Sequence, residues 1–133
     1  MGACGLAILL LPAALGCRDV SPAVASANYT RDLGHASALA LHGVCTLGYE
    51  RAATEADVDR LDRLGCVKAA HAHDALRAAH GVLVSVISAI DAGECARVVT
   101  APRSCDLAGA IRGVIRASAT MALAVRDIQE ASR

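Results

Sequence analysis

The last quarter of the chain has apolar residues at alternating steps of four and three, which places them on one face of an α-helix. The members of this series are Leu107, Ile111, Val114, Ser118, Met121, Val125 and Ile128. Three basic residues, Arg112, Arg116 and Arg126, fall on other faces, and Pro102 and Ser104 precede the series. The pattern predicts one amphipathic helix over residues 106–131.

Two earlier segments have the same helical period. The segment 66–91 closes at Gly93, and the segment 22–47 is expected to stop at Gly48. Their apolar positions are Ala72, Leu76, Ala79, Leu83, Val86 and Ile90 in the first case, and Leu33, Ala36, Ala40, Val44 and Leu47 in the second. Residues 82–90 have strand-like composition, but their place in this register favours a helix.

Short signals mark the helix ends. Ser21 before Pro22 is typical of an N-cap followed by proline at the first helical position, where the missing N–H costs nothing. Thr54 and Asp57 fit a variant capping box that opens a short helix over residues 55–64, with Gly65 at its end.

The three long segments have matched lengths of about 39 Å as helices. They predict an all-α fold, an up-down-up bundle in which 55–64 is a short extra helix, and a single domain over residues 22–133. Hydrophobic residues make up 55% of the chain, but Phe and Trp are absent and Tyr29 and Tyr49 are the only aromatic residues. A core of Ala and branched aliphatic residues suits close-packed helices.

Charge and motifs exclude several function classes. Thirteen basic residues balance thirteen acidic ones, and both signs are scattered, so we expect no nucleic-acid partner. No phosphate loop, nucleophile elbow or metalloprotease motif occurs. Asp57, Asp59 and Asp62 lie close together, but on a short polar helix they are expected to face water. We therefore expect no enzyme activity and no cofactor.

The N-terminus is uncharged and apolar. No charged residue occurs from Met1 to Gly16, and the run from Leu6 to Leu15 is half the ~20 residues that a membrane-spanning helix needs. Small residues at Ala14 and Gly16 then precede Cys17, as at a secretory cleavage site. Residues 1–16 are predicted to be a signal peptide, and the alternatives are a plain secretory leader without lipid and a buried N-terminal helix.

The sequence Ala14-Leu15-Gly16-Cys17 resembles the lipobox of bacterial lipoproteins. In that family the Cys thiol receives a diacylglyceryl group and becomes the mature N-terminus. The resemblance implies lipidation at Cys17, a tether over residues 17–21, and a location on a bacterial membrane facing the periplasm or the exterior. Two features depart from the family pattern: Ala14 stands where Leu is usual, and no Lys or Arg precedes the apolar run.

Four cysteines remain after Cys17, and three pairings of them are possible. In an up-down-up bundle Cys45 and Cys66 flank one connection, and Cys95 and Cys105 flank the other. This arrangement predicts the disulfides 45–66 and 95–105, which suit an oxidising compartment. The alternative is four buried thiols in a cytosolic protein. Neither pair has the spacing of a structural zinc site, so no metal is expected there.

Two helices share the pattern His-x₆-His-Gly-Val, with His35 and His42 on one and His73 and His80 on the other. Residues seven apart lie about 10.5 Å apart along a helix, so one metal site would need His35 near His80 or His42 near His73. The simpler interpretation is that these residues are half-exposed and flank the apolar seam.

These observations predict a non-catalytic structural or protein-interaction module, held at the membrane by a lipid on Cys17. Short Ala-rich helical lipoproteins of bacteria and their phages are similar in general texture. The alternative function is a helical domain that binds a metal or small ligand through His35/His42 and His73/His80.

Overall fold

The computed structural model describes residues 20–97 and 103–133. This part of the chain is helical and contains no strand, so the all-α prediction is confirmed. The predicted leader, Cys17 and Pro102 lie outside the described residues. The elements in chain order are α1 (Ser21–Leu41), η3 (His42–Thr46), α2 (Leu47–Arg51), α3 (Glu55–Leu64), α4 (Cys66–Asp91), η4 (Glu94–Arg97), η5 (Arg103–Cys105) and α5 (Leu107–Ala131).

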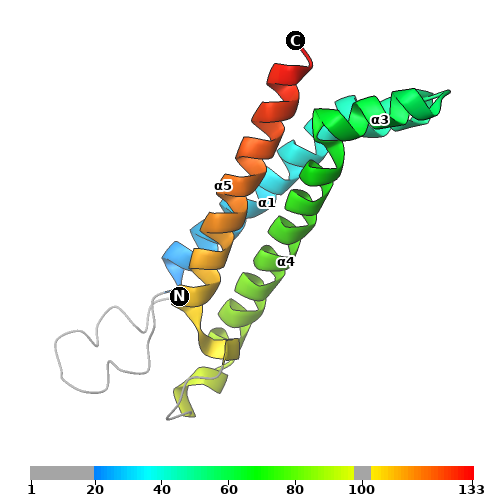
Figure 1. Cartoon of the computed structure of the whole chain (residues 1–133). Coiled ribbons are helices and arrows are strands. Elements are labelled where there is room, and N and C mark those ends of the chain that lie inside the picture. Colours follow the sequence, from blue (N-terminus) through cyan, green and yellow to red (C-terminus); the bar gives the residue numbers. More distant parts are fainter. Residues whose placement is uncertain (1–19, 98–102) are drawn as a thin grey trace.

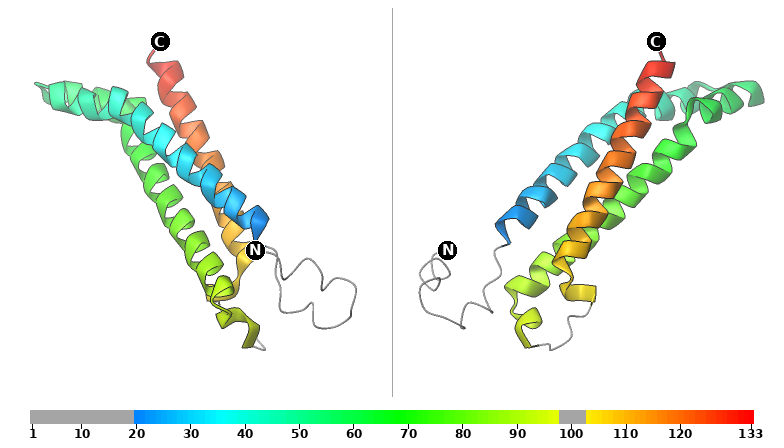
Figure 2. Two further views of the ribbon diagram at one scale, coloured as in Figure 1. Left: turned by 180° about the vertical axis from the view of Figure 1, so that it is seen from behind. Right: turned by 60° about the vertical axis from the view of Figure 1, so that its left-hand side comes forward.

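Three long helices pack side by side with alternating direction. Helix α1 runs upward in Figure 1, α4 runs down beside it, and α5 returns upward across both. Figure 2 shows that the chain changes direction after α1, so that α2 projects sideways from the bundle, and that α3 folds back along α2. We call this projecting hairpin, residues 42–64, the arm.

The first long helix does not stop at Gly48. It passes through a π-helical segment at His42–Thr46 and ends at Arg51, before the extended residue Ala52. At Gly48 the helix α3 packs so closely that a side chain would clash with it. A Cβ added at Gly48 would lie 2.7 Å from Cδ2 of Leu61. The glycine therefore permits helix packing and does not end the helix.

The buried face of α1 also differs from the predicted one. Its buried residues are Ala23, Ala27, Thr30 and Ser37, whereas Ala36 is exposed and Leu33 is only half-buried. Small side chains on this face let α1 approach α4 and α5 closely. The Thr30 hydroxyl can be buried because it donates to the Ser26 carbonyl oxygen at 2.6 Å.

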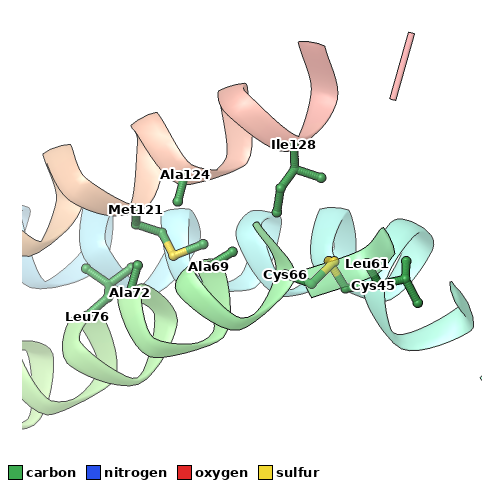
Figure 3. Packing of buried hydrophobic residues seen from close by; sticks show 9 residues of the cluster. All are labelled: Cys45, Leu61, Cys66, Ala69, Ala72, Leu76, Met121, Ala124 and Ile128. Carbon is green, nitrogen blue, oxygen red and sulfur yellow. A yellow bond between two sulfur atoms is a disulfide. The ribbon is translucent and has the colours of Figure 1, made fainter. Parts of the chain in front are cut away.

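The predicted faces of α4 and α5 largely match the structure, and their residues form two buried clusters. The upper cluster, at the arm end, contains Cys45, Leu61, Cys66, Ala69, Ala72, Leu76, Met121, Ala124 and Ile128 (Figure 3). The lower cluster contains Ala23, Ala27, Leu83, Val86, Ala110 and Val114. Ala79, Ile90, Leu107, Ile111 and Val125, which were also predicted to be in the core, are half-buried.

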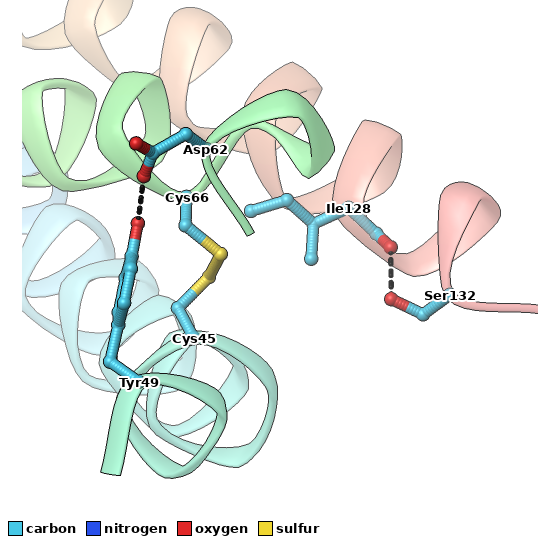
Figure 4. Close-up of a disulfide and its surroundings, with 6 residues drawn as sticks. All are labelled: Cys45, Tyr49, Asp62, Cys66, Ile128 and Ser132. Atoms are coloured by element: carbon cyan, nitrogen blue, oxygen red, sulfur yellow. Dashed lines mark hydrogen bonds between the residues drawn. A yellow bond between two sulfur atoms is a disulfide. The ribbon is translucent and has the colours of Figure 1, made fainter. Parts of the chain in front are cut away.

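Disulfides join the cysteines in the predicted pairs. The Cys45–Cys66 bond ties the end of the first long helix to the start of α4, and both residues belong to the upper cluster (Figure 4). The Cys95–Cys105 bond closes the connection between α4 and α5 at the opposite end. Each connection is therefore held by one covalent link.

Hydrogen bonds fix the arm and the helix starts. Thr54 caps α3 in the predicted capping box with Asp57, and Gly65 ends α3 in the left-handed region at φ 103°. The N-cap of α1 is Val20, so the predicted cap Ser21 is the first helical residue. Asp106, which the sequence pattern did not single out, caps α5 by accepting from the Gly109 N–H at 2.9 Å.

Candidate functional site

A cleft of about 450 Å³ lies between α1 and α4, and all the residues that line it come from these two helices. This volume is within the range of small-molecule sites. From α1 it is lined by Thr30, Arg31, Gly34, His35 and Ala38. From α4 it is lined by His73, Leu76, Arg77 and His80. Three imidazoles and two guanidinium groups thus share one cavity.

Helical spacing explains why these residues meet. Arg31 and His35 are four apart on α1, and His73, Arg77 and His80 are four and three apart on α4. Each set therefore lies on one face of its helix. Leu76, which is 1% exposed, also belongs to the upper cluster and gives the cleft an apolar wall. Gly34 lines the cleft across from Leu76 without a side chain, and a Cβ added there would be 3.9 Å from Cδ2 of Leu76.

The histidines predicted as candidates separate into two groups. His35 and His80 line the same cleft, as a shared site would require, and His73 joins them. His42 lies in the π-helical segment, is exposed and does not line the cleft. The pair His42 and His73 is therefore not brought together by this cavity.

Sequence reasoning missed Arg31 and Arg77. The available signal was their helical spacing from His35, His73 and His80. The search for a repeated histidine pattern did not find it, because the two arginines are not part of that pattern. Arg31 contacts the neighbouring carboxylate of Asp32 at 3.4 Å on the surface. No ion pair of Arg77 occurs within residues 20–97 and 103–133.

The ring of His80 has a buried nitrogen. Its Nδ1 is inaccessible to solvent and has no hydrogen-bond partner among the described residues. A proton on Nδ1 would have no acceptor there, and burying an unpaired donor costs about 1–3 kcal/mol. The neutral ring therefore favours the tautomer with its proton on Nε2, which leaves Nε2–H as a donor.

The lining of the cleft combines imidazole and guanidinium groups. Within the part of the chain that the structure describes, no group of three or more His, Cys, Asp or Glu residues could hold a metal ion. Neither a carboxylate nor a thiolate lines the cleft, whereas two guanidinium groups do. Positive groups without carboxylates favour an anion over a cation.

The aspartates of α3 have structural roles. The pKa of Asp57 is held below its usual range, first by a hydrogen bond from the Thr54 hydroxyl and then by the backbone N–H groups of Ala53 and Thr54. Asp62 accepts a hydrogen bond from the Tyr49 hydroxyl, which raises the pKa of Tyr49 (Figure 4). Asp59 is exposed. Asp57 and Asp62 therefore fix the arm through these hydrogen bonds.

A second hollow, of about 470 Å³, lies between α1 and α5 and is mostly apolar. Ala25, Tyr29, Ile115 and Ala122 line it, together with Ser118, whose Oγ is buried without a partner among the described residues. Its lining side chains include the hydroxyl groups of Ser26, Tyr29 and Ser118 but no charged group, whereas the α1/α4 cleft offers five basic side chains. The α1/α4 cleft is therefore the candidate binding site.

Helix α5 is, by length and composition, long and apolar enough to cross a membrane, and in residues 20–97 and 103–133 it alone meets that test. The core helix of a water-soluble bundle also meets it. In the structure α5 contributes Met121, Ala124 and Ile128 to the upper cluster and packs along α4 and α1.

Comparisons with family models, with curated proteins and with solved structures returned no match.

Proposed function

We propose that this protein is a small exported lipoprotein that acts as a non-catalytic interaction module of the bacterial cell envelope. The observation that carries the proposal is the use of cysteine. Cys17 follows an apolar leader, and the four cysteines after it are joined in two disulfides. Disulfides persist in oxidising compartments, and a lipobox-like cysteine at the start of the mature chain is the attachment point of a lipid.

The position of the bundle relative to Cys17 supports a short tether. Helix α1 begins at Ser21, only four residues after Cys17, so the start of the bundle stays within about 14 Å of a lipid on that cysteine. The arm follows the C-terminal end of α1, so it lies at the end of the bundle opposite to the start of α1 at Ser21 (Figure 1). A tethered bundle would therefore direct the arm away from the membrane, where a protein partner can reach it.

The test is an intact-mass measurement of the protein from its native host, combined with membrane fractionation. We expect loss of residues 1–16, an acyl mass on Cys17, and loss of four hydrogens from the remaining cysteines. A Cys17→Ser variant should move to the soluble exported fraction, while a Cys4→Ser variant, altered within the leader, should stay at the membrane. A full-length mass that keeps Met1 and four free thiols would contradict the proposal.

The alternative function is binding of a metal or a small ligand by the histidine pairs. The structure favours the small ligand over the metal. The α1/α4 cleft contains His35, His73 and His80, and the absence of acidic lining residues argues against a metal ion. The chemistry of this cleft leads to a separate inference.

A further inference from the structure

The basic side chains of the α1/α4 cleft come from two helices and face one cavity. Arg31 and His35 come from α1, and His73, Arg77 and His80 come from α4. Asp32 and Asp74 are close in sequence, but both are exposed and neither lines the cleft. Asp32 contacts Arg31 at 3.4 Å, whereas Arg77 has no ion pair among the described residues, so the lining of the cleft is basic although the whole chain has no net charge.

The number of N–H donors in the cleft limits the type of anion. Each guanidinium presents a fork of donors that matches two oxygens of a carboxylate or phosphate. A carboxylate has two oxygens, which one arginine can satisfy. A phosphate monoester has three terminal oxygens and a second negative charge, so it can use both arginines and at least one imidazole.

His80 adds a donor whose tautomer is already set. Since its buried Nδ1 has no acceptor among the described residues, the ring proton belongs on Nε2. Leu76 closes one wall of the same cleft with an apolar surface, which suits the organic part of a ligand.

From this arrangement we propose that the α1/α4 cleft is a binding site for a phosphate monoester group, held by Arg31, Arg77 and His80. The phosphate monoester belongs either to a small soluble molecule or to a lipid whose headgroup ends in such a phosphate, as in phosphatidic acid. The site does not depend on lipidation of Cys17, so it goes beyond the proposed function and can fail or hold independently of it.

Calorimetric titration of the oxidised full chain with phenyl phosphate and with inorganic phosphate tests the soluble source. Vesicles that contain phosphatidic acid, whose headgroup is a phosphate monoester, compared with vesicles of phosphatidylcholine alone, test the lipid source. We expect one site per chain for at least one of these probes. Measuring both the native protein and its Cys17→Ser variant separates this site from the tether, because binding should be the same in both.

Matched variants identify the residues. Arg77→Gln should weaken binding about tenfold or more, since it removes a charge-assisted hydrogen bond. Arg112→Gln, on the exposed face of α5, should leave binding unchanged. His80→Gln should weaken binding, while His71→Gln, on the exposed face of the same helix, should not.

A measurement on the unaltered protein covers the case in which a variant does not fold. In ¹⁵N spectra of the histidine rings, free His80 should show the Nε2–H tautomer, and saturating phenyl phosphate should shift its Nε2 resonance but not those of His71. The proposal is overturned if no probe binds, if Arg77→Gln binds as tightly as Arg112→Gln, or if the rings of His80 and His71 respond equally.

Discussion

The two ends of the bundle hold the same three helices together by different means. At the arm end, the Cys45–Cys66 disulfide is part of the buried upper cluster, beside Leu61 and Ile128. At the other end, the lower cluster is built from Ala23, Ala27 and larger aliphatic residues, and the Cys95–Cys105 disulfide lies outside it. At the upper end the disulfide and the buried side chains therefore stabilise the fold at the same place. At the lower end the disulfide lies apart from the buried cluster.

The first prediction compares the two disulfides. Replacing Cys45 and Cys66 by Ala should cost about 3–5 kcal/mol, because it releases a loop of 21 residues and leaves a cavity in the upper cluster. Replacing Cys95 and Cys105 should cost only about 2–3 kcal/mol, because the loop has 10 residues and the bond lies outside a cluster. Urea unfolding of both double variants measures the difference. Equal costs would show that cluster packing around Cys45–Cys66 adds nothing.

The second prediction compares one leucine from each cluster. Leu83→Ala should cost about 3–5 kcal/mol, because the neighbouring alanines cannot expand into the space. Leu76→Ala should cost less, about 2–3 kcal/mol, because its cavity opens into the α1/α4 cleft and can take up water. Thermal and urea unfolding give the two values, and the reverse order would show that the lower cluster is the more adaptable one.

The third prediction compares two glycines. Gly48→Ala places a Cβ 2.7 Å from Leu61 and should destabilise the arm end by about 1 kcal/mol. Gly81→Ala, on α4, meets nothing within 4 Å and should stabilise the protein by up to about 1 kcal/mol through helix propensity. Melting temperatures of the two variants should therefore shift in opposite directions. A stabilised Gly48→Ala variant would show that Leu61 can move aside.

The smallest expected effect is a pH dependence confined to the arm. Because the folded-state pKa of Asp57 is lowered, its contribution is present above the unfolded carboxyl pKa of about 3.9 and is lost as pH falls through the folded value. The Asp57→Asn variant should lose this part of the acid dependence of the melting temperature. Asp59→Asn, on the exposed side of α3, serves as control. If wild type and Asp57→Asn had the same acid dependence of the melting temperature, ionisation of Asp57 in the capping box would not contribute to stability.

Much of the fold follows from local patterns. The ends of α4 and α5 fall at the predicted positions because the signals that set them are local. These signals are the helical spacing of the apolar residues, Gly65 before α4 and the residues near 104 before α5. The cysteine pairing also follows once the topology is up-down-up, because each pair flanks one connection. Helix α1 was less predictable: its buried face consists of Ala, Thr and Ser, which a search for large apolar residues passes over.

The candidate site was only partly accessible to sequence reasoning. The shared histidine pattern pointed to the two helices that line the cleft, yet it included His42 and omitted Arg31 and Arg77. Two helices can be recognised singly from sequence, but which of their faces meet depends on how the helices are rotated against each other. That rotation is set by the packing of all three helices together.

The sequence by itself determined the helical content, the bounds of α4 and α5, the capping box at Thr54 and the likeness of residues 14–17 to a lipobox, because each depends on neighbours along the chain. Only the tertiary structure decided that the first long helical segment continues past Gly48 to Arg51, that the face of small residues on α1 is the buried one, and that five basic side chains line one cleft. The physical reason is that close packing selects among helix faces by shape, and complementary shape is a property of the assembled bundle and not of any one segment.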